Sequence, residues 1–407
     1  MKLSSVLLGA LLAVEASCAA TPRADDYSQL QDLAKQAEDI AKAQLQAASS
    51  KRAPAPPGKC TLQNLQIRRE WSTLSKEDRK AYTDACNCLA KKPAKTPAGV
   101  SSGAKSRWDD FTATHIAQTP TIHFTGSFLT WHRWFTWNME QALRNECGYK
   151  GPMPYWDWAQ TANTGLTKHP LFDGSAYSMS GDGAKVQQTG DIVLSQPSLP
   201  DIHLPTANGG GCVTSGPFKD WKVNLGPQQL SVPGGAIVGP PSGNPLDYNP
   251  RCLKRDLTDW VNRRYANASS VIDTIRRNSI YEFQGRMQGN LPLAETGGQP
   301  DIGIHGGPHY ALGGDPGRDV GVSSSDPAFF LHHGMIDRAY WIWQMLDYYP
   351  RTYGDNAING TGTFLNMPPS APQTLDTVLS QQYVTDQSFK IRDLVSTTAG
   401  PFCYIYL

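Results

Sequence analysis

Hydrophobic residues recur at helical spacing over much of this chain. From Cys60 onward the pattern predicts helices over residues 61–91, 104–117, 127–147, 253–265, 268–286 and 326–347. Between residues 160 and 250 the chain is rich in Gly, Pro, Ser and Asp and has few periodic stretches, which predicts mostly loop. No internal repeat of fixed period is found in the sequence. We therefore expect a mainly α-helical domain over residues 59–407, with long loops and few short strands.

The first twenty residues have the composition of a secretory signal peptide. Met1 and Lys2 give a positive start, residues 3–14 form an apolar run, and small residues follow at 16–20. The run is too short to cross a bilayer, and no later segment approaches about 20 consecutive apolar residues. We expect a secreted, extracellular protein with no membrane contact. Secretion would make the N-x-S/T sites at Asn267 and Asn359 available for glycosylation.

Residues 21–58 form an N-terminal extension and linker of different composition. Residues 49–58 are rich in Pro, Ala and Ser and include the basic pair Lys51-Arg52, which is typical of an exposed processing site. Two interpretations are open: a pro-segment removed after Arg52, or a retained N-terminal helix with an incidental basic pair. The apolar residues of this extension lie at helical spacing: Leu30, Leu33, Ala37, Ile40 and Leu45.

Composition excludes some partners and points to an oxidising compartment. With a net charge of +1, the chain of 407 residues has no electrostatic preference for nucleic acid or an anionic membrane. Removal of the signal peptide would also remove Cys18, and an odd number of cysteines would remain. We expect most of these to form disulfides, with one left free and the connectivity undetermined. They are Cys60, Cys86, Cys88, Cys147, Cys212, Cys252 and Cys403.

The histidines carry the chemistry of this sequence. Of nine histidines, two have no partner at ligand spacing, His169 and His203, and are expected to be spectators. The other seven form two clusters: His115, His123 and His132, then His305, His309, His332 and His333. Imidazole suits copper, zinc, iron and nickel, and two similar sets predict a pair of similar metal ions. His305 and His309 are four residues apart, so on a helix they share one face.

Four segments resemble the tyrosinase, catechol oxidase and haemocyanin superfamily. They are H-F-T-G-S-F-L-T-W-H-R at 123–133, P-Y-W-D-W at 154–158, D-P-A-F-F-L-H-H-G-M-I-D-R at 326–338 and Y-I-Y at 404–406. The similarity is greatest to short secreted fungal polyphenol oxidases without a C-terminal shielding domain. It runs from about Cys60 to the end of the chain. It implies a central four-helix bundle holding two copper ions, dioxygen as co-substrate and small phenols as substrates.

The resemblance also implies roles for individual residues. Asp337 and Arg133 are suited to pair between the helices that carry the ligands. His332 would support the ligands without being one of them. The implied ligands of the first copper, CuA, are His115, His123 and His132, and those of the second, CuB, are His305, His309 and His333.

The chain departs from the family pattern at positions that affect the copper site. Thr121 stands where many members have a cysteine that is cross-linked to the second CuA histidine, so we expect packing alone to orient His123. Hydroxylation of monophenols is attributed in the family to a water held by a glutamate and an asparagine. Gln288 and Gly306 occupy those positions here, and glutamine cannot act as a base. We therefore expect a catechol oxidase with weak monophenolase activity.

Two further residues bear on access to the copper ions. Val320 stands where plant relatives have a bulky gate, so the site should admit a broad range of phenols. Tyr310 is expected either to line the entrance or to act as a packing residue. The alternatives are a true tyrosinase or an o-aminophenol oxidase, and, from other classes, a haemocyanin-like oxygen carrier or a structural zinc glycoprotein.

Overall fold

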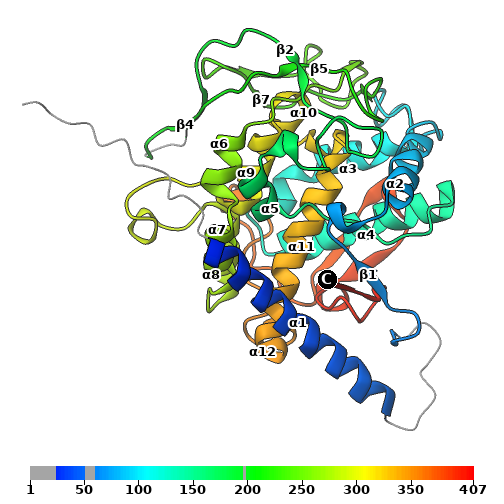
Figure 1. Ribbon diagram of the computed structural model, residues 1–407, viewed down its shortest axis with the longest axis vertical. Helices are drawn as coiled ribbons and strands as arrows, with labels where there is room; N and C mark the ends of the chain where they lie inside the picture. Colours follow the sequence, from blue (N-terminus) through cyan, green and yellow to red (C-terminus); the bar gives the residue numbers. More distant parts are fainter. Residues whose placement is uncertain (1–23, 51–59, 196–198) are drawn as a thin grey trace, which may run out of the picture.

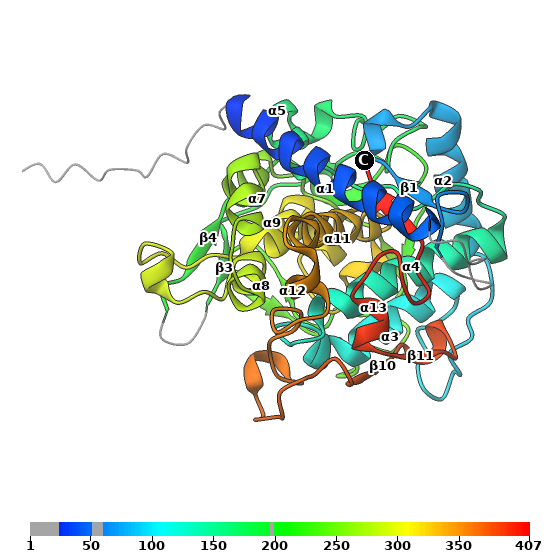
Figure 2. The ribbon, with the colours of Figure 1, turned by 90° about the horizontal axis from the view of Figure 1, so that it is seen from below.

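The computed structural model describes residues 24–50, 60–195 and 199–407. Its centre is a bundle of the helices α3 (Arg107–Ile122), α4 (Phe128–Cys147), α9 (Gly303–Leu312) and α11 (Ala328–Leu346). Helix α11 packs against α4 and α9, and α3 packs against α4. In both views α11 lies at the core of the molecule (Figures 1 and 2). The predicted mainly helical fold with a central four-helix bundle is confirmed.

Local sequence explains where the bundle helices begin and end. Helix α3 starts with a capping box, in which Ser106 and Asp109 satisfy each other's backbone N–H groups. Helix α4 ends at Gly148, whose φ of 71° is the left-handed conformation that glycine adopts without strain. Every residue of 328–345 in α11 is buried, as expected for a mostly apolar helix at the centre of a domain.

Shorter helices surround this bundle. Helices α6 and α8 pack against α9, and α2 packs against α4. The additional helices are α2 (Lys76–Leu89), α5 (Trp158–Thr164), α6 (Asp259–Tyr265), α7 (Ala268–Ile275), α8 (Ile280–Gln288), α10 (Gly314–Gly317), α12 (Tyr348–Thr352) and α13 (Ile391–Leu394). Single 3-10 turns occur at Trp71–Thr73, Leu166–Lys168, Leu293–Glu295, Ser323–Ser325, Phe364–Asn366 and Gln382–Val384.

The described strands are short and form two-stranded sheets, as the loop-rich composition predicts. One pair is parallel and joins the two ends of the domain: β1 (Gln66–Arg68) with β12 (Tyr404–Tyr406). The other pairs are antiparallel: β2 (Gly183–Lys185) with β5 (Gly210–Val213), β3 (Ile192–Leu194) with β4 (Ile202–Leu204), β6 (Lys222–Val223) with β9 (Arg251–Cys252), β7 (Leu230–Ser231) with β8 (Ile237–Val238), and β10 (Val378–Ser380) with β11 (Ser388–Lys390).

Three predicted helices were too long. The segment 61–91 is helical only in α2, because its first part pairs as β1 with the C-terminal strand. The segment 253–265 is helical only in α6. The segment 268–286 divides into α7 and α8, because Ser279 and Glu282 form a second capping box that starts a new helix. At the start of 253–265, Lys254 instead forms β-bridges with Cys212 and Pro316. In each case a contact or cap overrode the apolar periodicity.

The N-terminal extension folds as one long helix, α1 (Ala24–Ser50), on the surface of the domain. It runs across α11 in both views and also contacts α7 and β12 (Figures 1 and 2). Its buried stripe consists mostly of small residues, which allow a close approach: Leu30, Ala34, Ala37, Ala41 and Leu45. The predicted signal peptide, Cys18 and the pair Lys51-Arg52 lie outside the described residues. Among the helices of the described ranges, none has the length and hydrophobicity needed to cross a bilayer.

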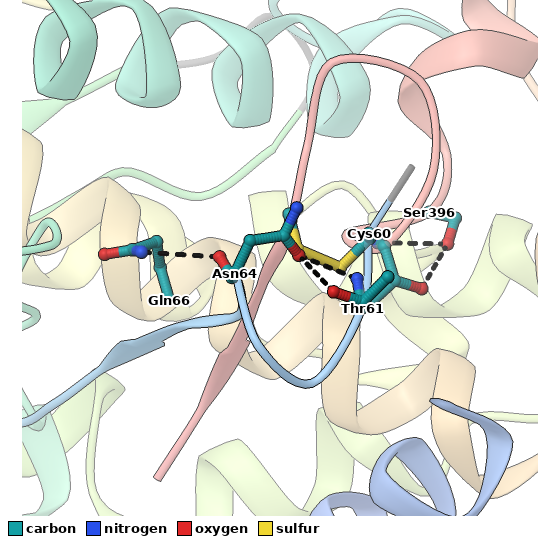
Figure 3. Close-up of a disulfide and its surroundings, with 7 residues drawn as sticks. Cys60, Thr61, Asn64, Gln66 and Ser396 are labelled. Atoms are coloured by element: carbon teal, nitrogen blue, oxygen red, sulfur yellow. Dashed lines mark hydrogen bonds between the residues drawn. A yellow bond between two sulfur atoms is a disulfide. The ribbon is translucent and has the colours of Figure 1, made fainter. Parts of the chain in front are cut away.

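Of the seven cysteines among the described residues, six form disulfides, as expected for an oxidising compartment. The pairs are Cys60–Cys403, Cys88–Cys147 and Cys212–Cys252, and Cys86 is buried and free. Cys60–Cys403 fastens the segment before β1 to the one before β12, beside the turn in which Thr61 N donates to Asn64 Oδ1 at 2.7 Å (Figure 3). Burial raises the pKa of the Cys86 thiol well above its usual range, so this cysteine is unreactive.

Candidate metal centre

The two histidine clusters of the sequence become two buried groups of imidazoles at the centre of the bundle. In each group the nitrogen atoms that could bind a metal lie within 4.8 Å of one another. The first group comes from α3 and α4, and the second from α9 and α11. The groups are His115, His123 and His132, and His305, His309, His332 and His333. All seven rings are buried.

Backbone carbonyl groups orient the rings of the first group. A carbonyl oxygen only accepts, so Nδ1 of each ring must carry the hydrogen and Nε2 is left with its lone pair. This is the arrangement usual for metal-binding histidines. The contacts are His115 Nδ1 to Gly321 O at 2.8 Å, His123 Nδ1 to Thr119 O at 3.1 Å and His132 Nδ1 to Phe128 O at 2.8 Å. The contact of His123 shows that the expectation of packing alone was wrong for this ring.

The second group contains buried nitrogens without a partner. Within the described part of the chain, His305 Nε2 and both ring nitrogens of His332 and His333 have no hydrogen-bond partner. Leaving such buried polar atoms unsatisfied costs about 1–3 kcal/mol each. A metal ion that accepts the lone pair of one nitrogen on each ligand ring would remove part of that cost. The donor set therefore fits a metal that prefers imidazole, such as copper.

Burial keeps the imidazoles neutral, which is the form that binds metals. It lowers the pKa of His123 to about 4 and that of His309 to about 3. For the other rings, burial and then the neighbouring histidines hold the pKa well below its usual range. At neutral pH every ring of both groups can therefore offer a lone pair.

Ring packing distinguishes His333 from His332. His333 stacks on His132 of the first group, with ring centroids 4.5 Å apart. His332 contacts His309 at 4.5 Å and His305 at 5.7 Å within the second group. It also contacts Trp158 at 5.2 Å and Trp156 at 6.3 Å, from the P-Y-W-D-W segment. His333 thus contacts rings of both groups, whereas His332 contacts the second group and the tryptophans.

A buried ion-pair network connects the helices that carry the histidines. Arg133 Nε donates to Asp337 Oδ1 at 2.5 Å, which joins α4 to α11 as the sequence predicted. Asp337 Oδ2 also accepts from the hydroxyls of Tyr404 and Tyr406, both at 2.6 Å, and from Arg68 Nη1 at 3.3 Å. Attraction from both arginines and bonds from both tyrosines outweigh burial and lower the pKa of Asp337. The Y-x-Y segment therefore contributes to this network.

Two members of the network were missed in the sequence. Arg68, fully buried on β1, donates to Glu140 Oε2 of α4 at 2.9 Å and stacks on the ring of Tyr404 at 3.6 Å. Arg68 lies within the segment 61–91 that the sequence predicted as a helix, so nothing in that prediction directed its side chain into the core. The polar–apolar–polar sequence Q-I-R at β1 is a weak signal for a strand, but the alternation does not place Arg68 in the core.

The loop before α11 places Val320 next to the first group. Gly321, which follows Val320, supplies the carbonyl that accepts from His115, and Val320 itself is 40% exposed. Tyr310 is partly buried and packs against the core. Burial raises the pKa of Tyr310, opposed by a hydrogen bond with Ser231. Tyr310 is thus a packing residue here, which favours the second of the two predicted roles.

Gln288 and Gly306 lie in different environments. The Gln288 side chain is buried, and its Oε1 accepts from the backbone N–H of Phe124 at 2.7 Å. Gly306 is partly exposed on α9, and a Cβ atom there would lie 3.0 Å from Ile302 Cβ. An asparagine at this position would therefore need a small shift of Ile302.

The remaining predicted residues lie outside the two groups. His169 is buried near Glu70 and Gln160, and His203 is exposed on β4, so both are absent from the metal-binding groups of the described chain. Asn359 is exposed. Asn267 caps α7: its Oδ1 accepts from Ser270 N at 2.9 Å and its Nδ2 donates to Arg263 O at 2.7 Å.

Known proteins share this fold and these segments. The family model described as the common central domain of tyrosinase matches residues 105–346, which include both histidine groups. Tyrosinase P from Aspergillus terreus is 42% identical over 346 residues, covering 84% of this chain and 91% of that protein. An N-acetyl-6-hydroxytryptophan oxidase from Emericella nidulans is 38% identical over 355 residues, covering 85% of this chain and 93% of that protein.

A solved structure agrees with this result. A glycine-to-asparagine mutant of the polyphenol oxidase from Thermothelomyces thermophila superposes with a TM-score of 0.82 at 40% identity. The match covers 93% of this chain and 98% of that one. A family model that spans more than half of the chain, together with relatives of this identity and coverage, establishes its membership. This chain belongs to the tyrosinase family of oxidoreductases.

Proposed function

We propose that this protein is a secreted dicopper polyphenol oxidase that converts o-diphenols into o-quinones with dioxygen as co-substrate. The observation that carries the proposal is the pair of buried, neutral imidazole groups, which fits the dicopper centre implied by the family. Two copper ions bound there supply the redox chemistry with dioxygen. The ligands would be His115, His123 and His132 for one ion and His305, His309 and His333 for the other.

His333 is preferred over His332 because of its position. Both rings lie beside His305 and His309, but His333 alone of the two also stacks on His132, and it is the residue that the family resemblance implies as the ligand. His332 lies against tryptophans and would limit the movement of the neighbouring rings. Replacement of His333 by alanine should remove one copper per chain. The same change at His332 should leave the copper content near two.

The chain's own residues explain a preference for diphenols over monophenols. A monophenol must lose its proton before it can be hydroxylated, and this step needs a basic group near the site. Gln288 has no basic atom, and its amide oxygen already accepts from Phe124 N–H. Gly306 offers no side chain to hold a water molecule. The exposed Val320, a small residue, leaves room for diphenols of varied size.

Oxygen uptake by copper-loaded protein tests this proposal, with catechol and tyrosine compared side by side and copper quantified. Uptake with catechol alone at about two coppers per chain supports a catechol oxidase. Comparable uptake with tyrosine would make it a true tyrosinase, and uptake with o-aminophenol would favour an o-aminophenol oxidase. Reversible oxygen binding without turnover would favour the carrier. A Gly306→Asn variant should raise the ratio of tyrosine to catechol turnover several-fold.

Secretion and processing are proposed on separate grounds. Three disulfides support an oxidising compartment. The match to the Thermothelomyces structure covers 93% of this chain. Residues 60–407 make up less than nine-tenths of the chain, so the matched part must include residues before Cys60. This favours retention of α1 over its loss as a pro-segment. N-terminal sequencing of the secreted protein would decide. A single sequence starting at Ala53 would contradict retention, whereas an additional sequence from a chain that contains α1 would show that the cleaved helix stays bound.

Asn359 is the better of the two candidate glycan acceptors in the folded protein. Its side chain is exposed, whereas both polar atoms of the Asn267 side chain are already bonded at the start of α7. A glycan on Asn267 would have to be added before α7 folds. Mass spectrometry of the secreted protein should find a glycan on Asn359 at higher occupancy than on Asn267.

A further inference from the structure

The loop between α3 and α4 holds one histidine of the first group under different constraints from the other two. His115 lies inside α3 and His132 inside α4, but His123 is the residue at which α3 ends, with extended backbone angles. The next residue, Phe124, has a φ of 51°, in the left-handed region that side chains other than glycine avoid. Such a conformation persists only when surrounding groups hold it in place. The position of His123 therefore depends on what holds this loop.

Gln288 holds the peptide directly after His123. Its Oε1 accepts from Phe124 N–H at 2.7 Å, and the side chain is 5% exposed. The end of α8, where Gln288 lies, fits tightly against the start of α9. A Cβ atom at Gly303 of α9 would lie 2.1 Å from Met287 O. Gln288 therefore connects the loop of His123 to the helix that carries the second histidine group.

Gln373 holds the other end of the same loop. The side-chain Oε1 of Gln373 accepts from Ser127 N–H at 2.7 Å, and the backbone N–H of Gln373 donates to Gly360 O at 2.9 Å. Gly126 N–H donates to Thr361 O at 3.1 Å. A Cβ atom at Gly126 would lie 3.1 Å from both Gln373 Oε1 and Gly360 O, so the two segments are in direct contact.

Aromatic packing reinforces this contact. The ring of Phe124 meets the ring of Phe364 edge to face, with centroids 4.8 Å apart. Phe364 belongs to the same segment, 359–373, that supplies Gln373. This segment therefore approaches the loop at Phe124 as well as at Gly126 and Ser127.

We propose that Gln288 and Gln373 are positioning residues that keep His123 in place as a copper ligand. Their two amide oxygens form a noncovalent clamp in a chain that has Thr121, exposed to solvent, where many relatives have a cross-linked cysteine. The inference rests on the proposed copper-binding role of His123. Without the clamp, Phe124 relaxes to a more favourable φ and carries His123 away from its partners. Copper is then released more readily from the first group than from the second.

Copper release tests this proposal without a turnover measurement. Gln288→Met and Gln373→Met keep side-chain length but remove the accepting oxygen. Each should speed the loss of one copper per chain to a chelator by roughly tenfold, the effect expected when one such bond is lost. Gln373→Glu keeps an accepting oxygen at a partly exposed position, so this variant should release copper at the wild-type rate.

Gln284 provides a matched control on the same helix. It lies one turn before Gln288 and is similarly buried at 6%. Its Nε2 donates to Asn359 O, at the start of the segment 359–373, and it makes no bond to the ligand loop itself. Gln284→Met should lower the melting temperature of the copper-free protein about as much as Gln288→Met does. It should speed copper release far less than Gln288→Met does, because no bond to the ligand loop is lost. The comparison separates general loss of stability from loss of ligand positioning.

The possible outcomes separate this inference from the proposed function. A wild-type protein that does not hold two coppers would contradict the proposed function itself. A wild-type protein that holds two coppers, with Gln288→Met and Gln373→Met variants that release them at the wild-type rate, would overturn the clamp alone. Equal acceleration by Gln284→Met would also overturn it, because the effect would then reflect stability. Failure of Gln373→Glu to restore the rate would show that the accepting oxygen is not what matters.

Discussion

Replacing Asp337 with asparagine should destabilise this protein strongly and loosen both histidine groups. The carboxylate is fully buried between α4 and α11 and receives hydrogen bonds from two arginines and two tyrosines. Asparagine has nearly the same shape, so packing is kept and the negative charge is lost. Arg133 would then be buried with only neutral acceptors, Val395 O and Gln344 Oε1. Arg68 would keep its bond to Glu140.

The size of the effect follows from this difference between the two arginines. Removing one partner of a buried ion pair costs about 3–5 kcal/mol, because the other charge is left uncompensated. That is a large part of the 5–15 kcal/mol by which a typical domain is stable. Only the pair with Arg133 is fully broken, so we expect a loss of about 3–5 kcal/mol in the free energy of unfolding.

The pH dependence of this loss has a definite sign. Asp337 has a pKa lowered by Arg133, Arg68 and the two tyrosines, although burial opposes them. A carboxyl group with a lowered pKa in the folded state stabilises the protein above its unfolded pKa of about 3.9. That contribution is lost as the pH falls through the lower, folded value. The difference between wild type and Asp337→Asn should therefore be constant near neutral pH and shrink only below about pH 4.

Urea unfolding of the copper-free proteins and copper content after dialysis provide the measurements. Asp326→Asn is a matched control, because Asp326 is also buried and binds Arg255 through two contacts of 2.7 and 2.8 Å. Both variants should lose stability, but only Asp337→Asn breaks a bond between two ligand helices and should also lose copper. A loss under about 1 kcal/mol for Asp337→Asn, far below the cost of breaking a buried pair, would refute the reasoning.

Three other predictions concern different parts of the molecule. Burial raises the pKa of Glu70 to about 7, so its proton favours the folded state and wild-type stability should fall between about pH 4.5 and 7. Glu70→Gln should remove about 3 kcal/mol of that fall. Urea titrations at several pH values measure the free energy of unfolding, and a pH dependence equal to that of the wild type would contradict the prediction. Ala37→Glu buries a charge under α1 and should cost more than about 2 kcal/mol in thermal or urea unfolding, whereas exposed Gln36→Glu should cost under about 0.5. Val320→Phe should raise KM several-fold for bulky diphenols and little for catechol, and equal effects on both would exclude Val320 from access control.

The sequence alone was sufficient to find the histidine groups, because their signals are local. His305 and His309 share a helix face through their spacing of four, and His132 and His333 lie in apolar helical segments whose periodicity is strong. The pairing of Arg133 with Asp337 was also predicted, since both neighbour ligand positions on helices. Spacing along one helix is fixed by helix geometry, so such patterns survive folding unchanged.

Tertiary structure decided which distant groups orient these histidines. His115 donates to a carbonyl 206 residues away, and Phe124 donates to a side chain 164 residues away. Such bonds form because burial forces each polar group to find a partner wherever the fold brings one close. The same need placed Arg68 in the core, where an extended strand overrode a predicted helix. The sequence by itself determined which residues could bind the metals, while burial and long-range hydrogen bonds decided how those residues are held.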